Sequence, residues 1–147
     1  MSEDYAFIIN TPTEFRSIRK TIHEKLFECF SGDQMLVDLS LFEMTTNAWK
    51  HGNKMNPSKK IHIKILFLKE SMLVRVKDEG KGFQVPDSLK TCYESCRDSV
   101  VHLEQGRGIQ LTTQIMDQLV YSKEGNDLLL RKWYTSHNFE GVEIDEF

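Results

Sequence analysis

The stretch Glu43-Met-Thr-Thr-Asn47-Ala-Trp-Lys-His51-Gly52 carries three polar side chains at intervals of four residues. Side chains at this spacing lie on one face of an α-helix, so a carboxylate, an amide and an imidazole are presented together. On its own, such a pattern is most often a solvated helix face. Two glycine-bearing segments that follow it in the chain give it more weight.

The first of these segments is Asp78-Glu79-Gly80-Lys81-Gly82-Phe83, in which a carboxylate at the end of a predicted strand runs into a glycine turn. The second is Gly106-Arg107-Gly108-Ile109, a glycine pair that opens an apolar, helix-like stretch. A carboxylate base, an oxygen ligand for a hard cation, a flexible loop and a helix N-terminus are the parts of a nucleotide-phosphate site. Together the three segments predict such a site.

Hydrophobic periodicity predicts secondary-structure elements in the order βααββαββ. The first helix opens with a capping box at 11–14, and the second is capped by Asp33 and ends at Gly52-Asn53. A strand at 61–67 pairs through a turn with a strand that reaches Asp78. The other elements are a strand at 5–9, a helix at 108–117 and strands at 119–122 and 128–133. The helix residues expected to face the core are Phe15, Ile18, Ile22, Leu26, Phe30, Val37, Leu41, Met44 and Ala48.

This order predicts an α+β fold, a two-layer α/β sandwich in which three helices cover one face of a mixed or antiparallel sheet. We expect a single domain at 1–134 and an acidic, flexible tail at 135–147. Residues 84–105 are polar and aperiodic. So long a segment without regular structure inside a domain predicts a functional lid.

Composition excludes several classes of protein. The net charge of −3 gives no broad electrostatic attraction to nucleic acid or to an anionic membrane, so neither is expected as a partner. No apolar run approaches the ~20 residues of a transmembrane helix, and the N-terminus lacks a signal-peptide pattern. The three cysteines favour free thiols in a reducing cytoplasm over a disulfide framework. The P-loop pattern Gly-x4-Gly-Lys-[Ser/Thr] is absent.

In order and spacing, the three segments resemble the N box, G1 box and G2 box of the GHKL ATPases, the superfamily that includes DNA gyrase and the histidine kinases. Within it the chain most resembles the small anti-sigma-factor serine kinases of bacteria, the RsbW type, over residues 6–133. The resemblance implies the Bergerat (GHKL ATPase) fold, in which ATP and Mg²⁺ lie between the helical layer and a lid.

The resemblance also implies roles for individual residues. Asn47 would be the magnesium ligand, and Glu43 would be the base that accepts a proton from the attacking group. The alternative for Glu43 is a surface carboxylate paired with Lys50 or Lys54. Asp78 would accept a hydrogen bond from the exocyclic amine of adenine, where guanine has a carbonyl. The other residues expected to hold the nucleotide are Lys50, His51, Gly80, Gly82, Phe83, Gly106, Arg107, Gly108, Ile109 and Asn126.

The last hairpin departs from the family pattern. The resembled proteins often carry a Gly-Thr pair there, whose threonine helps to hold adenine through water. This chain has Gly125-Asn126 instead. Either Asn126 substitutes for the threonine or that contact is missing.

The resemblance favours one function, an ATP-binding anti-sigma factor that phosphorylates a serine of a STAS-type antagonist and so regulates transcription by partner switching. Its partners would be a sigma factor and the STAS-domain protein, and the resemblance implies a homodimer. Basic residues outside the core of the first helix, Arg16, Arg19 and Lys20, are expected to hold the sigma factor. Two alternatives remain: a non-catalytic ATP-dependent protein-binding switch and a stand-alone histidine-kinase-like ATPase domain.

Overall fold

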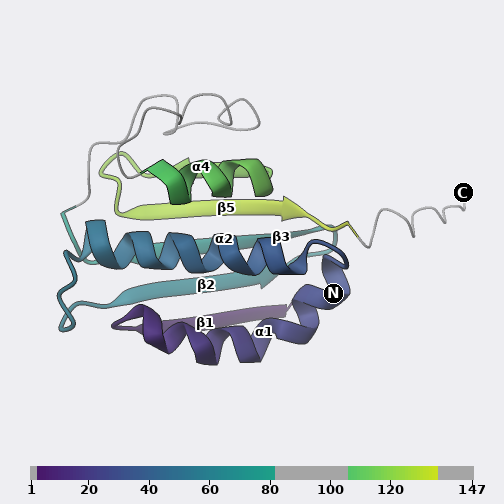
Figure 1. The fold of residues 1–147 in the computed structure, drawn as a ribbon, viewed down its shortest axis with the longest axis horizontal. Coiled ribbons are helices and arrows are strands. Elements are labelled where there is room, and N and C mark those ends of the chain that lie inside the picture. Colours follow the sequence, from purple (N-terminus) through teal and green to yellow (C-terminus); the bar gives the residue numbers. More distant parts are fainter. Residues whose placement is uncertain (1–2, 82–105, 136–147) are drawn as a thin grey trace, which may run out of the picture.

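Five antiparallel strands form one sheet in the computed structural model, which describes residues 3–81 and 106–135 (Figure 1). The strands lie side by side in the order β1-β2-β3-β5-β4, and every neighbouring pair is antiparallel. The sequence left open whether the sheet is mixed or antiparallel, and among the described strands it is antiparallel. The strand bounds are β1 Glu3–Ile9, β2 Ile61–Phe67, β3 Ser71–Asp78, β4 Gln118–Tyr121 and β5 Asp127–Trp133.

Three helices form the second layer on one face of this sheet, and α2 lies between α1 and α4 (Figure 1). The predicted α+β sandwich and its order of elements are therefore confirmed. A short 3₁₀ turn precedes α1, and a π-helical turn continues α2. The bounds are 3₁₀ turn Pro12–Glu14, α1 Phe15–Cys29, α2 Gln34–Asn47, π-helical turn Ala48–Gly52 and α4 Gly106–Ile115.

Two hydrophobic periods build the core between the layers. Along β2, buried apolar residues alternate with residues that point to the solvent. This is the two-residue period of a strand in a sheet with one covered face. Along α1 and α2, every apolar residue predicted to face the core is buried. The core ends in Tyr134, just after β5, whose ring packs edge-on against Phe30 and whose hydroxyl donates to the Leu68 carbonyl at 2.6 Å.

The first helix begins through a capping arrangement that the sequence predicted. The Glu14 carboxylate accepts the backbone N–H groups of Asn10 and Thr11 at 3.0 and 3.1 Å. These N–H groups have no partner within the helix, so the carboxylate satisfies them. This contact fixes the direction in which α1 leaves β1.

The end of the second helix differs from the prediction, which had one regular helix running to Gly52. From Ala48 the turn widens, and the N–H of Asn53 donates to the Ala48 carbonyl five residues earlier at 2.8 Å. Lys54 and Met55 then adopt left-handed φ angles of 55° and 59°, which reverse the chain toward β2. Single π-helical turns of this kind occur frequently at functional sites.

Two predictions lie outside the described residues. One is the lid at 84–105, and the other is the tail, of which only Thr135 is described. In the part of the chain that is described, no helix has the length and apolar character needed to span a membrane.

Candidate functional site

A small cavity lies where the end of α2 meets the end of β3 and the turn before β5. Its volume is about 10 Å³, room for about one water molecule. The walls combine apolar side chains with two amides and two carboxylates. The lining residues are Met44, Asn47, Ala48, Gly52, Val76, Asp78, Tyr121, Gly125, Asn126, Asp127 and Leu128.

Asp78 is the buried carboxylate of this cavity. As the last residue of β3 it is only 6% exposed, and its Oδ1 accepts the Gly80 N–H at 2.8 Å. Burial is the main cause that raises the pKa of Asp78, and Asp127 raises it slightly more. The Gly80 N–H and the charge of Lys59 act in the opposite direction. A desolvated carboxylate in a cavity is a recognition group for a hydrogen-bond donor.

Two glycines let the end of α2 touch Asp78. A Cβ built on Gly52 would lie 2.7 Å from Asp78 Oδ1 and closer still to the rest of the carboxylate. A Cβ on Gly80 would overlap the carbonyl of Gly52. Neither position has room for a side chain, so both residues must be glycine for the two segments to meet at this distance.

Asn47 and Asn126 bring amide groups to the same cavity. The Asn47 amide nitrogen donates to the Tyr121 hydroxyl over a long contact of 3.5 Å. Asn126 holds the turn before β5 against Asp78, since its carbonyl accepts the Asp78 N–H at 3.0 Å and its side chain contacts the Gly80 carbonyl at 3.4 Å. The residue that replaces the family's threonine therefore lies directly beside Asp78.

Glu43 lies one turn before Asn47 on α2 and meets the first turn of α4. A Cβ built on Gly108 would stand 2.8 Å from Glu43 Oε1, so the α4 backbone approaches this carboxylate closely. Within the described residues Glu43 forms no ion pair, so it is not paired with Lys50 or Lys54, the alternative that the sequence left open. The structure thus brings the first and third sequence segments together at Glu43 and Gly108.

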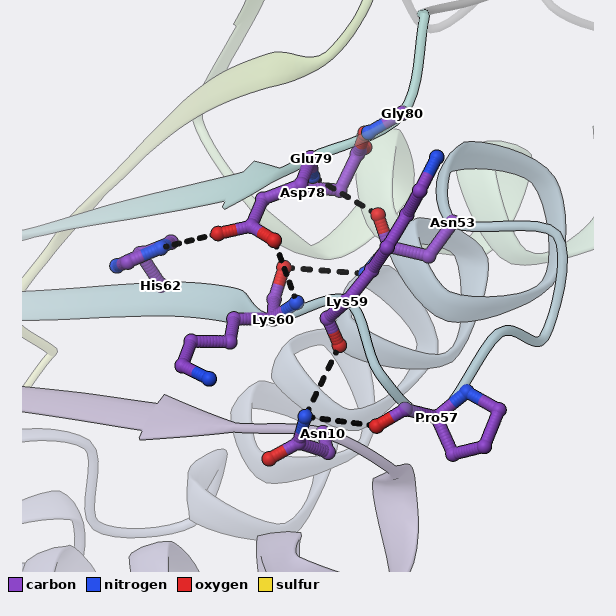
Figure 2. Close-up of polar contacts among 9 residues, drawn as sticks. All are labelled: Asn10, Asn53, Pro57, Lys59, Lys60, His62, Asp78, Glu79 and Gly80. Atoms are coloured by element: carbon purple, nitrogen blue, oxygen red, sulfur yellow. Dashed lines mark hydrogen bonds and ion pairs between the residues drawn. The ribbon is translucent and has the colours of Figure 1, made fainter.

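Asn53 joins the helix end to the strand end from behind the cavity (Figure 2). Its side chain is fully buried, and its carbonyl oxygen accepts the Glu79 N–H at 2.8 Å. Its amide nitrogen donates to the Lys60 carbonyl at 3.0 Å, and the Glu79 carboxylate accepts the Lys60 N–H in return. One amide therefore fixes Glu79, which stands between Asp78 and Gly80.

Several predicted residues lie elsewhere. Lys50 is exposed and His51 half-buried, and neither lines the cavity. Burial, followed by the charges of Lys50 and Lys54, lowers the pKa of His51 and favours its neutral form. The Ile109 side chain is fully buried in the core, which leaves only its backbone to face a ligand.

Four further predicted positions are described in part or not at all. Gly106 and Arg107 open α4, but only their backbone is described. Gly82 and Phe83 lie outside the described residues.

Sequence reasoning missed several residues of the site, among them Tyr121 and Asn53. Tyr121 is a buried tyrosine at the end of a strand, and the pattern alone indicates a core residue. Asn53 follows a glycine at a helix end, where asparagine ordinarily ends helices without further meaning. The only signal for Asn53 was its position directly after the His51-Gly52 pair, and for Tyr121 the sequence held none.

The comparison with known families gives one result. The sequence model of the histidine kinase-like ATPase domain matches residues 8–132, most of the chain. The chain belongs to the histidine kinase-like ATPase family. No curated protein matches the sequence.

Histidine kinase-like ATPase domains bind ATP, usually with Mg²⁺, and the described residues fit both groups. The Asp78 carboxylate lines the cavity between apolar walls, and its burial suits it to accept a hydrogen bond from a base. Asn47 supplies a neutral oxygen, the kind of ligand that Mg²⁺ takes together with phosphate oxygens and water. No cluster of three or more acidic, histidine or cysteine side chains occurs within 3–81 and 106–135. Asn47 stays the protein ligand that the resemblance implies.

The glycine contact yields a first prediction. Gly52→Ala should push the Asp78 carboxylate out of place and abolish the rise in melting temperature caused by ATP and Mg²⁺. The control is Gly32→Ala, at a glycine with φ of +96° and no atom near its Cβ position. This variant should lose about 1–2 kcal/mol of stability through backbone strain and keep its response to ATP. A full response of Gly52→Ala in thermal denaturation would contradict the assignment.

The buried amide yields a second prediction. Asn53→Ala leaves the Glu79 N–H and the Lys60 carbonyl without partners, and should lower the free energy of unfolding by about 1–3 kcal/mol in urea denaturation. Asn56→Ala, an exposed asparagine in the same loop, is the matched control and should change stability by less than about 1 kcal/mol. Equal effects of the two substitutions would show that Asn53 does not hold the loop.

Proposed function

We propose that the protein is an anti-sigma factor with serine kinase activity, which uses ATP and Mg²⁺ to phosphorylate a STAS-type antagonist and otherwise sequesters a sigma factor. The observation that supports the proposal is the arrangement of Glu43 and Asn47 on one face of α2. That face runs from the first turn of α4, at Gly108, to the cavity of Asp78. Base, cation ligand, phosphate-binding helix end and adenine-binding carboxylate then follow one another along this face of α2.

Each residue has a definite task in this proposal. Asp78 accepts a hydrogen bond from the exocyclic amine of adenine, and Asn47 offers its side-chain carbonyl oxygen to Mg²⁺. The backbone N–H groups at the start of α4 face the phosphates, where the helix dipole favours negative charge. Glu43 accepts the proton of the attacking serine hydroxyl. ATP would supply the γ-phosphoryl group to the serine oxygen, with ADP as the leaving group, and Mg²⁺ would neutralise the charge that develops on the phosphate oxygens.

The surface that we propose for the sigma factor differs from the sequence prediction at one residue, Arg19. Arg19 forms a bidentate ion pair with Asp38, with both contacts of its Nε at 2.8–2.9 Å, and its guanidinium lies over the Phe15 ring at 5.2 Å. It is therefore engaged within its own chain. Arg16 and Lys20 are exposed and, within the described residues, have no ion-pair partner. We place the sigma-factor contact on these two residues, and the homodimer remains part of the proposal.

Asp78→Asn tests nucleotide binding. At a ligand concentration one hundred times the Kd, ATP with Mg²⁺ should stabilise the wild type by about 2.7 kcal/mol, and Asp78→Asn should remove most of this effect in thermal denaturation. Asp127→Asn is the control, because that carboxylate also lines the cavity but is bound to Arg75. It should keep the response. A wild type whose melting temperature ignores ATP and Mg²⁺ would overturn the proposal.

The same variant has an expected effect without nucleotide. Because the pKa of Asp78 is raised in the folded state, the folded protein binds this proton more tightly than the unfolded chain. Stability from this group is thus lost as pH rises through the folded-state pKa. Asp78→Asn, which carries no charge, should have the higher free energy of unfolding at pH 7. Its advantage should shrink as the pH falls toward the unfolded-state pKa of about 3.9.

Glu43→Ala tests the transfer step. With the STAS-domain protein as acceptor, phosphoserine formation should fall roughly 10²–10⁴-fold while nucleotide affinity is nearly kept. Asn47→Ala should instead weaken Mg²⁺-dependent binding. Unchanged transfer by Glu43→Ala would contradict its role as base. Nucleotide binding by the wild type with no transfer to any acceptor would assign the chain as a non-catalytic ATP-dependent switch.

A further inference from the structure

The face of the sheet opposite the helices gathers positive charge. The register places Lys64 directly across from Arg75, and His62 directly across from Lys77. All four side chains are exposed. Basic residues directly opposite one another in neighbouring strands destabilise the pairing unless negative charge lies nearby. We call these four residues the cationic face.

Two of these four side chains have a carboxylate partner. The Arg75 guanidinium binds the Asp127 carboxylate, with its Nε 2.9 Å from Oδ1, and the His62 Nε2 lies 3.3 Å from Glu79 Oε2. The Lys64 and Lys77 ammonium groups have no hydrogen bond or ion pair within the residues that the structure describes. Asp127 lies across from Lys77 in the register, but its carboxylate is bound to Arg75. Two ammonium groups on adjacent strands are therefore left for a ligand.

The cationic face also has apolar surroundings. A shallow groove runs across it and is lined on the β1 side by Ala6 and by Ile8, which is 58% exposed. On the other side, β5 turns Leu129 and Trp133 outward, and they are 43% and 48% exposed. A ligand that matches this surface carries several carboxylates interspersed with apolar side chains.

We propose that the acidic C-terminal segment of this same chain, residues 139–147, docks on the cationic face. Its sequence is Phe139-Glu-Gly-Val-Glu-Ile-Asp-Glu-Phe147. It provides both kinds of group that the surface calls for. The carboxylates are Glu140, Glu143, Asp145 and Glu146, and the apolar residues are Phe139, Val142, Ile144 and Phe147.

The length of the segment is sufficient to reach the face. The Tyr134 N–H donates to the Glu70 carbonyl at the β2–β3 turn, and the Thr135 N–H donates to the Cys29 carbonyl at the end of α1. The chain therefore leaves the sheet at this end on the helical side, and the segment has to pass round the end of the sheet to reach the opposite face. From Ser71 at this end, Lys77 lies six residues along β3, roughly 20 Å away. Glu143 lies eight residues beyond Thr135, a reach of up to about 27 Å in an extended chain. The acidic residues can therefore lie over both free lysines without moving the sheet.

A second copy of the chain fits this surface less well. Two copies related by a twofold axis would place the same patch against itself, which sets positive charge against positive charge. The C-terminal segment instead has the opposite charge, and its attachment gives it a high effective concentration.

Carbodiimide crosslinking of the full-length chain tests the proposal, because it joins only amines and carboxylates already in contact. Mass spectrometry should find segment carboxylates linked to Lys64 and Lys77. The yield should fall as NaCl is raised to about 0.5 M, where exposed ion pairs are screened. A mixture of ¹⁵N-labelled and unlabelled protein should show these links within single chains. Absence of the links, or links only between chains, overturns the proposal.

Charge-reversed variants supply the control. Lys64→Glu with Lys77→Glu should weaken docking roughly two- to thirtyfold, the combined effect of two surface ion pairs, as read from hydrogen exchange of β2 and β3 amides and from Trp133 fluorescence. Replacing the four acidic residues of the segment by lysine in that background should restore docking, with crosslinks again at positions 64 and 77. Lys54→Glu, at an exposed lysine in the loop that follows α2, should have no effect. Equal crosslinking to Lys54 and Lys64, or no restoration, refutes specific docking.

Discussion

The site depends on the close contact between Gly52 and Asp78. At this point the end of α2 and the end of β3 approach until no side chain fits between them, and the Gly52 carbonyl lies against Gly80 in the same way. The π-helical turn and the left-handed residues after it exist at the place where the helix must deliver this glycine and then return to β2. Asn53 holds the joint from the buried side. Asp78, the buried carboxylate of the cavity, takes its position from this joint.

The contact between Gly52 and Asp78 lowers the stability of the folded protein when no ligand is bound. Closing the joint desolvates Asp78, and only the Gly80 N–H and the distant charge of Lys59 offset the loss of water. A carboxylate held in this state gains more from a hydrogen-bond donor than an exposed one would. The same burial that lowers the stability of the free protein therefore favours binding of an amine-bearing base, which is the usual trade between stability and function at a binding site.

The sequence predicted the layers because both depend on local periodicity. The alternation of β2 and the three-to-four spacing of α1 and α2 determine which side of each element is buried, and those sides confirm the predicted core. The π-helical turn could not be predicted, because a widened last turn preserves the apolar spacing that indicates a helix. The roles of Asn53 and Tyr121 could not be predicted either. They depend on contacts with residues far away in the chain, and a single sequence has no record of such contacts.

Net charge was a poor guide to the surface for a related reason. A total of −3 predicts no electrostatic footprint, yet the antiparallel register sets four basic residues side by side on one sheet face. Along each strand these basic residues alternate with buried residues and point outward. In a single strand this pattern is the ordinary solvated face of a half-buried strand. The four basic side chains come together on one surface only because β2 and β3 pair in this register. Four of the 22 acidic residues lie in the C-terminal segment that we propose docks on this face. The surface electrostatics of this protein therefore follow from where the chain places its charges rather than from their sum.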